Sequence, residues 1–191
     1  MESFTQKEGG VKKIGEIEPI EQMRDMMVTR KEQLSSLVEK PLLSACQILY
    51  DKNIRTTGSS ANKKDIGNGK VYITIDFDTL SQENKKIAED IGKIYQSDEI
   101  TQVKIEIPTD SEDVVEDIQL KAEKIANKFK KQQLLWARVY TLGDLRVMYG
   151  YDPEDEEMKI KDFANGEHDS YFYDPINNIF FESEELYRKA T

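Results

Sequence analysis

The clearest strand signal in the sequence is Val71-Tyr72-Ile73-Thr74-Ile75-Asp76-Phe77. Apolar and polar residues alternate along this stretch, and successive side chains of a strand point to opposite faces of a sheet. One face is expected to be buried and carries Val71, Ile73, Ile75 and Phe77. The other face is expected to meet water and carries Asp76, with Asp78 following. The stretch therefore predicts a strand that packs on a hydrophobic core through one side.

The segments on either side of this strand extend the sheet. Upstream, residues 54–57 form a short strand candidate, and the turn signal Asn68-Gly69 predicts a long-looped hairpin between the two strands. Downstream, Ser81 is a predicted cap for a helix over residues 82–96, and residues 102–107 alternate as a further strand. A helix over residues 112–132 is expected next, followed by a strand over residues 134–140, with a helix as the alternative for that last stretch.

This order of elements determines the expected fold class. Strands that are joined through helices favour parallel pairing with right-handed crossovers, whereas the hairpins add antiparallel neighbours. We therefore expect an α/β protein, with α+β as the alternative. Its core is a mixed sheet of about four to six strands with helices packed on it.

The two ends of the chain add smaller elements. Apolar residues at helical spacing predict a helix over residues 19–38, and Pro41 starts a second, deeply buried helix that contains Cys46. Beyond a short helix that stops at Gly150, an acidic link spans residues 152–157. A β-hairpin of residues 170–173 and 179–182 follows. We expect a mobile arm at residues 1–18, a main α/β domain at residues 19–150, and an appendage at residues 151–191 whose hairpin packs on that domain.

Composition limits the classes of partner. The chain has 191 residues and a formal net charge of -10, which disfavours binding to the phosphate backbone of nucleic acids. Its single cysteine allows no intrachain disulfide, and the N-terminus lacks an apolar signal segment. No apolar run approaches the roughly 20 residues that span a bilayer. These features predict a cytoplasmic protein without a membrane segment.

One constellation of residues has a recognised chemistry. Gly58-Ser59, then Asp76 and Asp78 at alternate positions, then Glu106 on the next strand, resemble the signature of the polymerase-beta-type nucleotidyltransferases. The resemblance implies that Gly58 and Ser59 hold nucleotide phosphate, while the three carboxylates bind magnesium for nucleotidyl or phosphoryl transfer.

The same residues also have a purely structural interpretation, which we favour. Carboxylates on the wet face of a strand in an acidic protein need no metal or cofactor, and Glu106 can pair with a lysine across strands. In the same way, Cys46 is expected to be a small buried hydrophobe, and the lone His168 to be solvated.

The leading hypothesis is therefore a soluble binding or regulatory protein that contacts another protein, and whether the chain is an enzyme stays open. Three candidate contact surfaces are the methionine-containing helix near the N-terminus, the acidic link at residues 152–157, and the aromatic C-terminal hairpin. A homo-oligomer is a further possibility, with the N-terminal helix as the dimer face.

Overall fold

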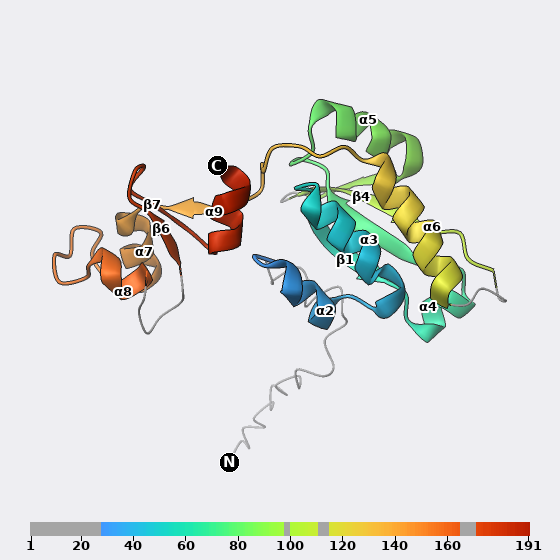
Figure 1. Ribbon diagram of the computed structural model, residues 1–191, viewed down its shortest axis with the longest axis horizontal. Helices are drawn as coiled ribbons and strands as arrows, with labels where there is room; N and C mark the ends of the chain where they lie inside the picture. The colour runs from blue at the N-terminus through green and yellow to red at the C-terminus, as the bar shows by residue number, and fades with distance from the viewer. Residues whose placement is uncertain (1–27, 98–99, 111–114, 165–170) are drawn as a thin grey trace, which may run out of the picture.

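The computed structural model describes residues 28–97, 100–110, 115–164 and 171–191. Its elements form two groups, a larger one around a four-stranded sheet and a smaller one around a three-stranded sheet (Figure 1). The expected arm at residues 1–18, the first part of the expected helix over residues 19–38, and His168 lie outside the described residues.

The larger sheet has the strand order β1-β2-β4-β3. Its strands are β1 (Thr56–Ser60), β2 (Tyr72–Asp76), β3 (Lys93–Gln96) and β4 (Thr101–Glu106), and each neighbouring pair is antiparallel. The hairpin between β1 and β2 is confirmed. The core face of β2 is also confirmed, since Val71, Ile73 and Ile75 are buried.

The expected parallel pairing of the central strands is wrong, and the chain path explains why. Because β2 and β3 both run antiparallel to β4, they run in the same direction as each other. Helix α5 (Gln82–Ile91) is therefore a crossover between two strands of equal direction, and β4 is inserted between them. The class is α+β, with helices on antiparallel sheets.

Gly92 is where the expected long helix over residues 82–96 stops. Ser81 caps α5 as predicted, because its side chain accepts a hydrogen bond from the Asn84 backbone. A Cβ at Gly92 would lie 2.4 Å from Val103 Cγ2 and 3.0 Å from the Lys104 carbonyl oxygen, so only glycine allows this close approach. The chain then continues as β3, not as helix.

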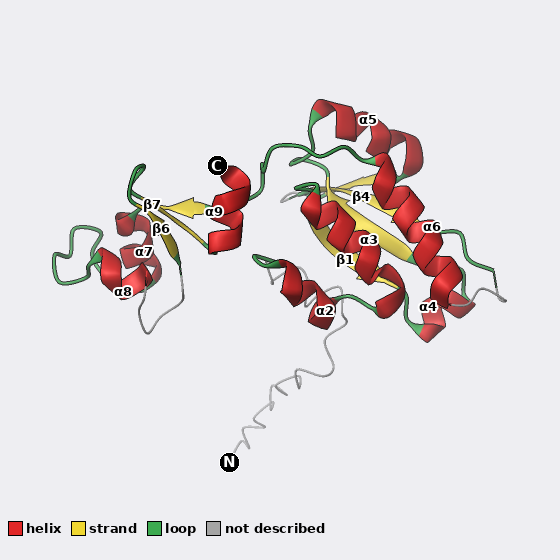
Figure 2. Ribbon diagram, in the orientation of Figure 1, coloured by secondary structure: helices red, strands yellow, loops and turns green. Residues whose placement is uncertain are grey.

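Helices cover one face of the larger sheet. Helices α3 (Lys40–Asp51) and α6 (Val115–Lys128) lie side by side in front of the strands (Figures 1 and 2). Leu42 and Leu49 of α3 and Ile118 of α6 are almost completely buried in the main core with the apolar residues of β2 and β4. Short helix α4 (Lys63–Gly67) lies in the long loop between β1 and β2.

The described part of the N-terminal region is less helical than expected. Arg30 is extended, with φ -140° and ψ 140°, and only the 3₁₀ turn η2 (Lys31–Gln33) and helix α2 (Leu34–Leu37) follow. Leu34 and Val38 nevertheless reach the main core.

The smaller sheet has the order β5-β7-β6, again antiparallel throughout. Its strands are β5 (Val139–Tyr140), β6 (Phe172–Asp174) and β7 (Ile179–Phe181), and the β6–β7 hairpin is the one predicted from the sequence. The expected strand over residues 134–140 shrinks to β5, because Trp136 is instead buried against the main core. Helices α7 (Leu142–Met148), α8 (Ile160–Ala164) and α9 (Glu184–Ala190) complete this group.

The middle strand β7 joins two hydrophobic cores. Phe180 packs with Leu145 and Phe163 in a smaller core, whereas Phe181 belongs to the main core together with Leu186 of α9. The smaller core therefore takes residues from both sides of the expected division at residue 150. None of the helices described is long and apolar enough to cross a membrane.

Candidate functional site

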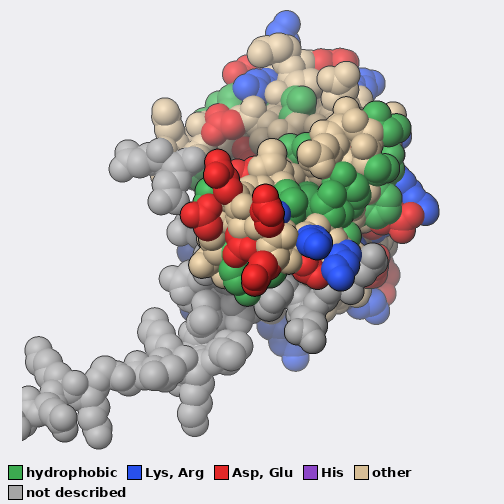
Figure 3. Space-filling view, turned by 90° about the vertical axis from the view of Figure 1, so that its left-hand side faces the viewer, with side chains coloured by type: hydrophobic (Ala, Val, Ile, Leu, Met, Phe, Trp, Pro, Cys, Tyr) green, Lys and Arg blue, Asp and Glu red, His purple; other side chains and the backbone are tan. Residues whose placement is uncertain are grey.

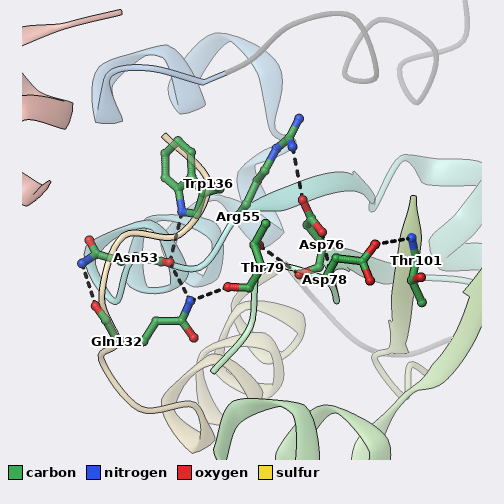
Figure 4. Close-up of polar contacts among 8 residues, drawn as sticks. All are labelled: Asn53, Arg55, Asp76, Asp78, Thr79, Thr101, Gln132 and Trp136. Carbon is green, nitrogen blue, oxygen red and sulfur yellow. Dashed lines mark hydrogen bonds and ion pairs between the residues drawn. The ribbon is translucent and has the colours of Figure 1, made fainter. Parts of the chain in front are cut away.

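Asp76 lies at the end of β2, where it is 3% exposed (Figure 4). Its Oδ2 is 3.2 Å from Arg55 Nη1, and its Oδ1 accepts a hydrogen bond from the Asp78 backbone at 3.2 Å. Burial raises the pKa of Asp76, and the charge of Arg55 and the backbone hydrogen bonds oppose this rise only in part. Asp76 was expected to face water, but its carboxylate is buried and forms an ion pair with Arg55.

Asp78 follows the strand and is exposed. Its Oδ2 accepts a hydrogen bond from the Thr101 backbone at 2.8 Å, which ties the turn after β2 to the start of β4 (Figure 4). Asp76 and Asp78 therefore lie together as turn-forming residues, and both carboxylate oxygens of Asp76 and Oδ2 of Asp78 are bonded to protein groups.

Glu106 lies far from these two aspartates. It is opposite Tyr72 in the β2–β4 register, whereas Asp76 is opposite Gln102, four residues along the strand. At about 3.3 Å per residue this separates Glu106 from Asp76 by roughly 13 Å along the sheet. The carboxylate of Glu106 is instead 3.7 Å from Lys93 and 3.9 Å from Lys104. The structure does not bring the three carboxylates to one ion, and no group of three metal-binding side chains occurs among the described residues.

Gly58 and Ser59 lie inside strand β1 and not in a turn. A Cβ at Gly58 would lie 2.6 Å from Thr74 Oγ1, so Gly58 serves close packing of two strands. Ser59 pairs with Ile73, is 1% exposed, and faces the core beside Cys46. Neither residue is placed to hold a phosphate near Asp76, so the arrangement that the nucleotidyltransferase resemblance implies is not formed.

Cys46 is fully buried, as expected. Burial and the nearby charge of Glu39 raise its pKa to about 12, although Ser59 acts in the opposite direction. The thiol is therefore protonated at neutral pH and is poorly suited to nucleophilic chemistry.

A buried polar network lies beside Asp76 and was not predicted from the sequence (Figure 4). The Gln132 side chain donates to the carbonyl oxygens of Thr79 at 2.8 Å and Asn53 at 3.2 Å. Trp136 Nε1 donates to the same Asn53 oxygen at 3.1 Å. Asn53 follows α3 in the left-handed conformation, with φ 61°, which is common at the ends of helices. An asparagine at this position was the one feature of the sequence that pointed to the network. The network joins distant segments and has the character of a structural support.

The C-terminal group presents a different kind of surface. Residues 152–157, which we call the acidic turn, contain Asp152, Glu154, Asp155, Glu156 and Glu157. All of them except the half-buried Asp155 are exposed. Figure 3 shows acidic side chains gathered beside hydrophobic ones at this end of the molecule.

Hydrogen bonds hold the acidic turn in one shape. Arg146 of α7 donates from Nη1 to the Pro153 carbonyl at 2.9 Å, and from Nε to the Met158 carbonyl at 3.0 Å. Inside the turn, the carboxylates of Asp152 and Asp155 each accept a hydrogen bond from the backbone two residues later, at 2.8 Å. Local bonds of this kind stabilise turns. This role of Arg146 was not foreseen, and no pattern in the sequence indicates it.

Three apolar side chains lie next to the acidic turn, and we call them the apolar patch. Val147 and Met148 are 57% and 56% exposed at the end of α7, and Tyr151 is 39% exposed. Gly150, with φ 82°, ends the helix, and the Tyr151 backbone then donates to the Arg146 carbonyl at 2.8 Å. The patch and the acidic turn are therefore adjacent and are held by the same arginine.

The aromatic hairpin is more buried than the acidic turn. Phe180 and Phe181 are buried, while Tyr171, Phe172 and Tyr173 are half-buried. These three residues line an open pocket of about 460 Å³ together with Ile160, Lys161 and Ala164 of α8. Much of the predicted aromatic surface is thus part of the core.

Comparisons with known proteins add no relative. No protein family, curated protein or solved structure matches the chain.

Proposed function

We propose that this protein is a soluble, cytoplasmic binding or regulatory protein that recognises a segment of another protein through the acidic turn and the apolar patch. The partner segment carries lysine or arginine side chains next to apolar ones. The observation that carries the proposal is the anchoring of the acidic turn by Arg146 beside three exposed apolar side chains.

The shape of the acidic turn supports this proposal. A cluster of like charges repels itself and is stable in one conformation only if other contacts hold it. Here the guanidinium of Arg146 bonds to two backbone carbonyls and leaves the carboxylates pointing to the surface. A surface that is ordered before binding loses less entropy when a partner docks.

The chemistry of the two parts indicates the kind of partner. Exposed carboxylates attract cationic side chains and raise the rate of encounter, whereas apolar side chains supply the burial that slows dissociation. Exposed methionine adapts its shape to different apolar partners. A segment that is both basic and apolar satisfies both parts of the surface.

The cytoplasmic location is part of the same proposal. Its support is the single cysteine, which is buried and free and so suits a reducing compartment.

Binding of a defined peptide tests the proposal. The probe is a labelled amphipathic peptide of leucine and lysine at helical spacing, and fluorescence anisotropy measures its affinity. We expect Glu154→Gln/Glu156→Gln/Glu157→Gln to weaken binding about tenfold, or about 1.4 kcal/mol. The matched control is Glu83→Gln/Glu89→Gln/Asp90→Asn, which removes the same charge from exposed positions around α5. This control is expected to change the affinity by less than about twofold.

A second pair of variants tests the apolar part. Val147→Asn/Met148→Gln should weaken binding of the same peptide, whereas Ile176→Asn, at an apolar side chain that is 86% exposed elsewhere, should not.

Equal losses in the acidic variant and its control would show general attraction to an acidic protein and would contradict the proposed site.

A further inference from the structure

Strand β3 is an open edge of the larger sheet. It is the last strand in the order β1-β2-β4-β3, and all four of its residues are exposed. Ile94 and Tyr95 point to opposite faces of the sheet, and their side chains are nevertheless both exposed, at 45% and 51%. An edge of this kind offers unpaired backbone groups to another strand.

The opposite edge of the same sheet is protected. Strand β1 has an irregular register between Thr56 and Gly58, and four of its five residues are buried. By contrast, β3 pairs with β4 without interruption from Lys93 to Gln96 and contains no proline. Bulges, prolines and covering segments are three of the usual protections of an edge, and among the described residues β3 has none of these three.

The hydrogen-bond phase of β3 shows which groups are free. The Ser97 backbone donates to the Ile100 carbonyl at 3.1 Å, so Ser97 and Ile100 form a hydrogen-bonded pair. Such pairs alternate along an antiparallel ladder, which makes Tyr95–Gln102 the next one. The N–H and C=O groups of Ile94 and Gln96 therefore point to the open edge, on either side of Tyr95.

We propose that two copies of the chain pair through β3 in antiparallel fashion, with Tyr95 at the two-fold axis. In this register Ile94 of each copy exchanges two backbone hydrogen bonds with Gln96 of the other, so all the free groups of both strands are used. The two Tyr95 residues face each other at a non-hydrogen-bonded position, where Cα atoms are about 4.5 Å apart. A register centred on Ile94 uses fewer of these groups.

The charges at this edge fit a second copy. Lys93 is the only charged residue of β3 and already lies 3.7 Å from Glu106 of its own chain. With Tyr95 on the axis, Lys93 falls opposite Ser97 of the other copy, so the two Lys93 side chains do not face each other across the pair. The two sheets then form one continuous sheet, and this dimer does not use the acidic turn.

A cysteine placed on the axis tests the register. Tyr95→Cys should form a disulfide-linked dimer under mild oxidation, because the two positions face each other at close range. Lys93→Cys is the matched control on the same strand and face. Its two copies are about four residues apart along the pair, roughly 13 Å, and should not link. Equal linking of both variants would overturn the register.

Analytical sedimentation of variants at Ile94 tests whether β3 is the pairing edge. The wild-type chain should be a dimer, and Ile94→Pro should be monomeric, since proline removes an N–H that points to the open edge and not to β4. Ile94→Thr keeps the N–H and should remain dimeric, and circular dichroism checks that each variant is folded. A wild-type monomer at every concentration, or a folded Ile94→Pro dimer, would overturn the proposal. A monomer that instead binds an added extended peptide at β3 would also overturn it.

Discussion

At the residue scale, three polar side chains hold the turn that follows β2. Asp76 and Asp78 shape the turn after β2, and Gln132 supports it from the other side. The alternation of residues 71–77 correctly predicted a strand with a buried apolar face. It could not predict that Arg55 would enclose Asp76, because that contact depends on where the neighbouring chain lies.

The raised pKa of Asp76 predicts a pH dependence of stability. An acid whose pKa is higher in the folded state binds protons more tightly there. Stability is therefore lost as pH rises through the window just above the ordinary value of 3.8. Asp76→Asn removes this contribution. We expect the wild type to lose free energy of unfolding relative to Asp76→Asn as the pH rises above about 4, measured by urea denaturation. A relative gain by the wild type over that range would contradict the prediction.

Gln132 provides a second prediction at this scale. Its oxygen accepts from the Ser81 backbone at 2.9 Å and from Asn84 at 2.8 Å, and its nitrogen donates to two carbonyls. Gln132→Leu leaves these groups without their partner and should cost about 2 to 4 kcal/mol in unfolding free energy. Gln133→Leu is the control at an exposed neighbour and should cost less than about 0.5 kcal/mol.

At the element scale, helix starts were predicted well and strand pairing was not. Ser81 begins α5 where expected, and a capping box of Thr141 and Asp144 begins α7, because caps are local interactions. Residues 93–96 form β3, whereas the sequence predicted them to be the end of a helix. Gly92 separates α5 from β3. The need for glycine there comes from a close contact with β4, which lies later in the sequence.

Gly92 and Gly67 form a matched pair for testing this boundary. A Cβ at Gly92 would collide with Val103, so Gly92→Ala should destabilise the protein by about 1 to 3 kcal/mol. At Gly67, the last residue of α4, no atom lies within 4 Å of the new Cβ. Gly67→Ala should therefore stabilise the protein by about 0.4 to 1 kcal/mol, measured by chemical denaturation. Equal effects of the two substitutions would show that the close approach at Gly92 does not limit the strand.

At the scale of the whole molecule, the two groups of elements are joined by several contacts. Besides Phe181 and Leu186 in the main core, Lys189 of α9 donates to the Tyr50 carbonyl at 3.0 Å. The Ser183 hydroxyl also donates to the Thr29 carbonyl at 2.6 Å. Sequence patterns predicted that the hairpin packs on the larger group, but they could not show that β7 is shared by both cores.

This sharing predicts a single cooperative unfolding transition. Trp136, the only tryptophan, is buried between Asn53 and Tyr50 and reports on the main core. Far-ultraviolet circular dichroism reports on both groups of elements. The two signals should change together in urea, and Phe180→Ala should lower the midpoint of both. An earlier change in circular dichroism than in fluorescence would show that the smaller group unfolds separately.

The central functional claim is that the acidic turn and the apolar patch form one binding surface. Nuclear magnetic resonance titration of the full chain with the leucine–lysine peptide tests this claim most directly. The account predicts that the peptide changes the amide chemical shifts mainly at residues 146–157. In the variant Arg146→Met these changes should spread to other residues or disappear. Shifts spread along α5 and α6, or centred on the pocket beside β6, would contradict it.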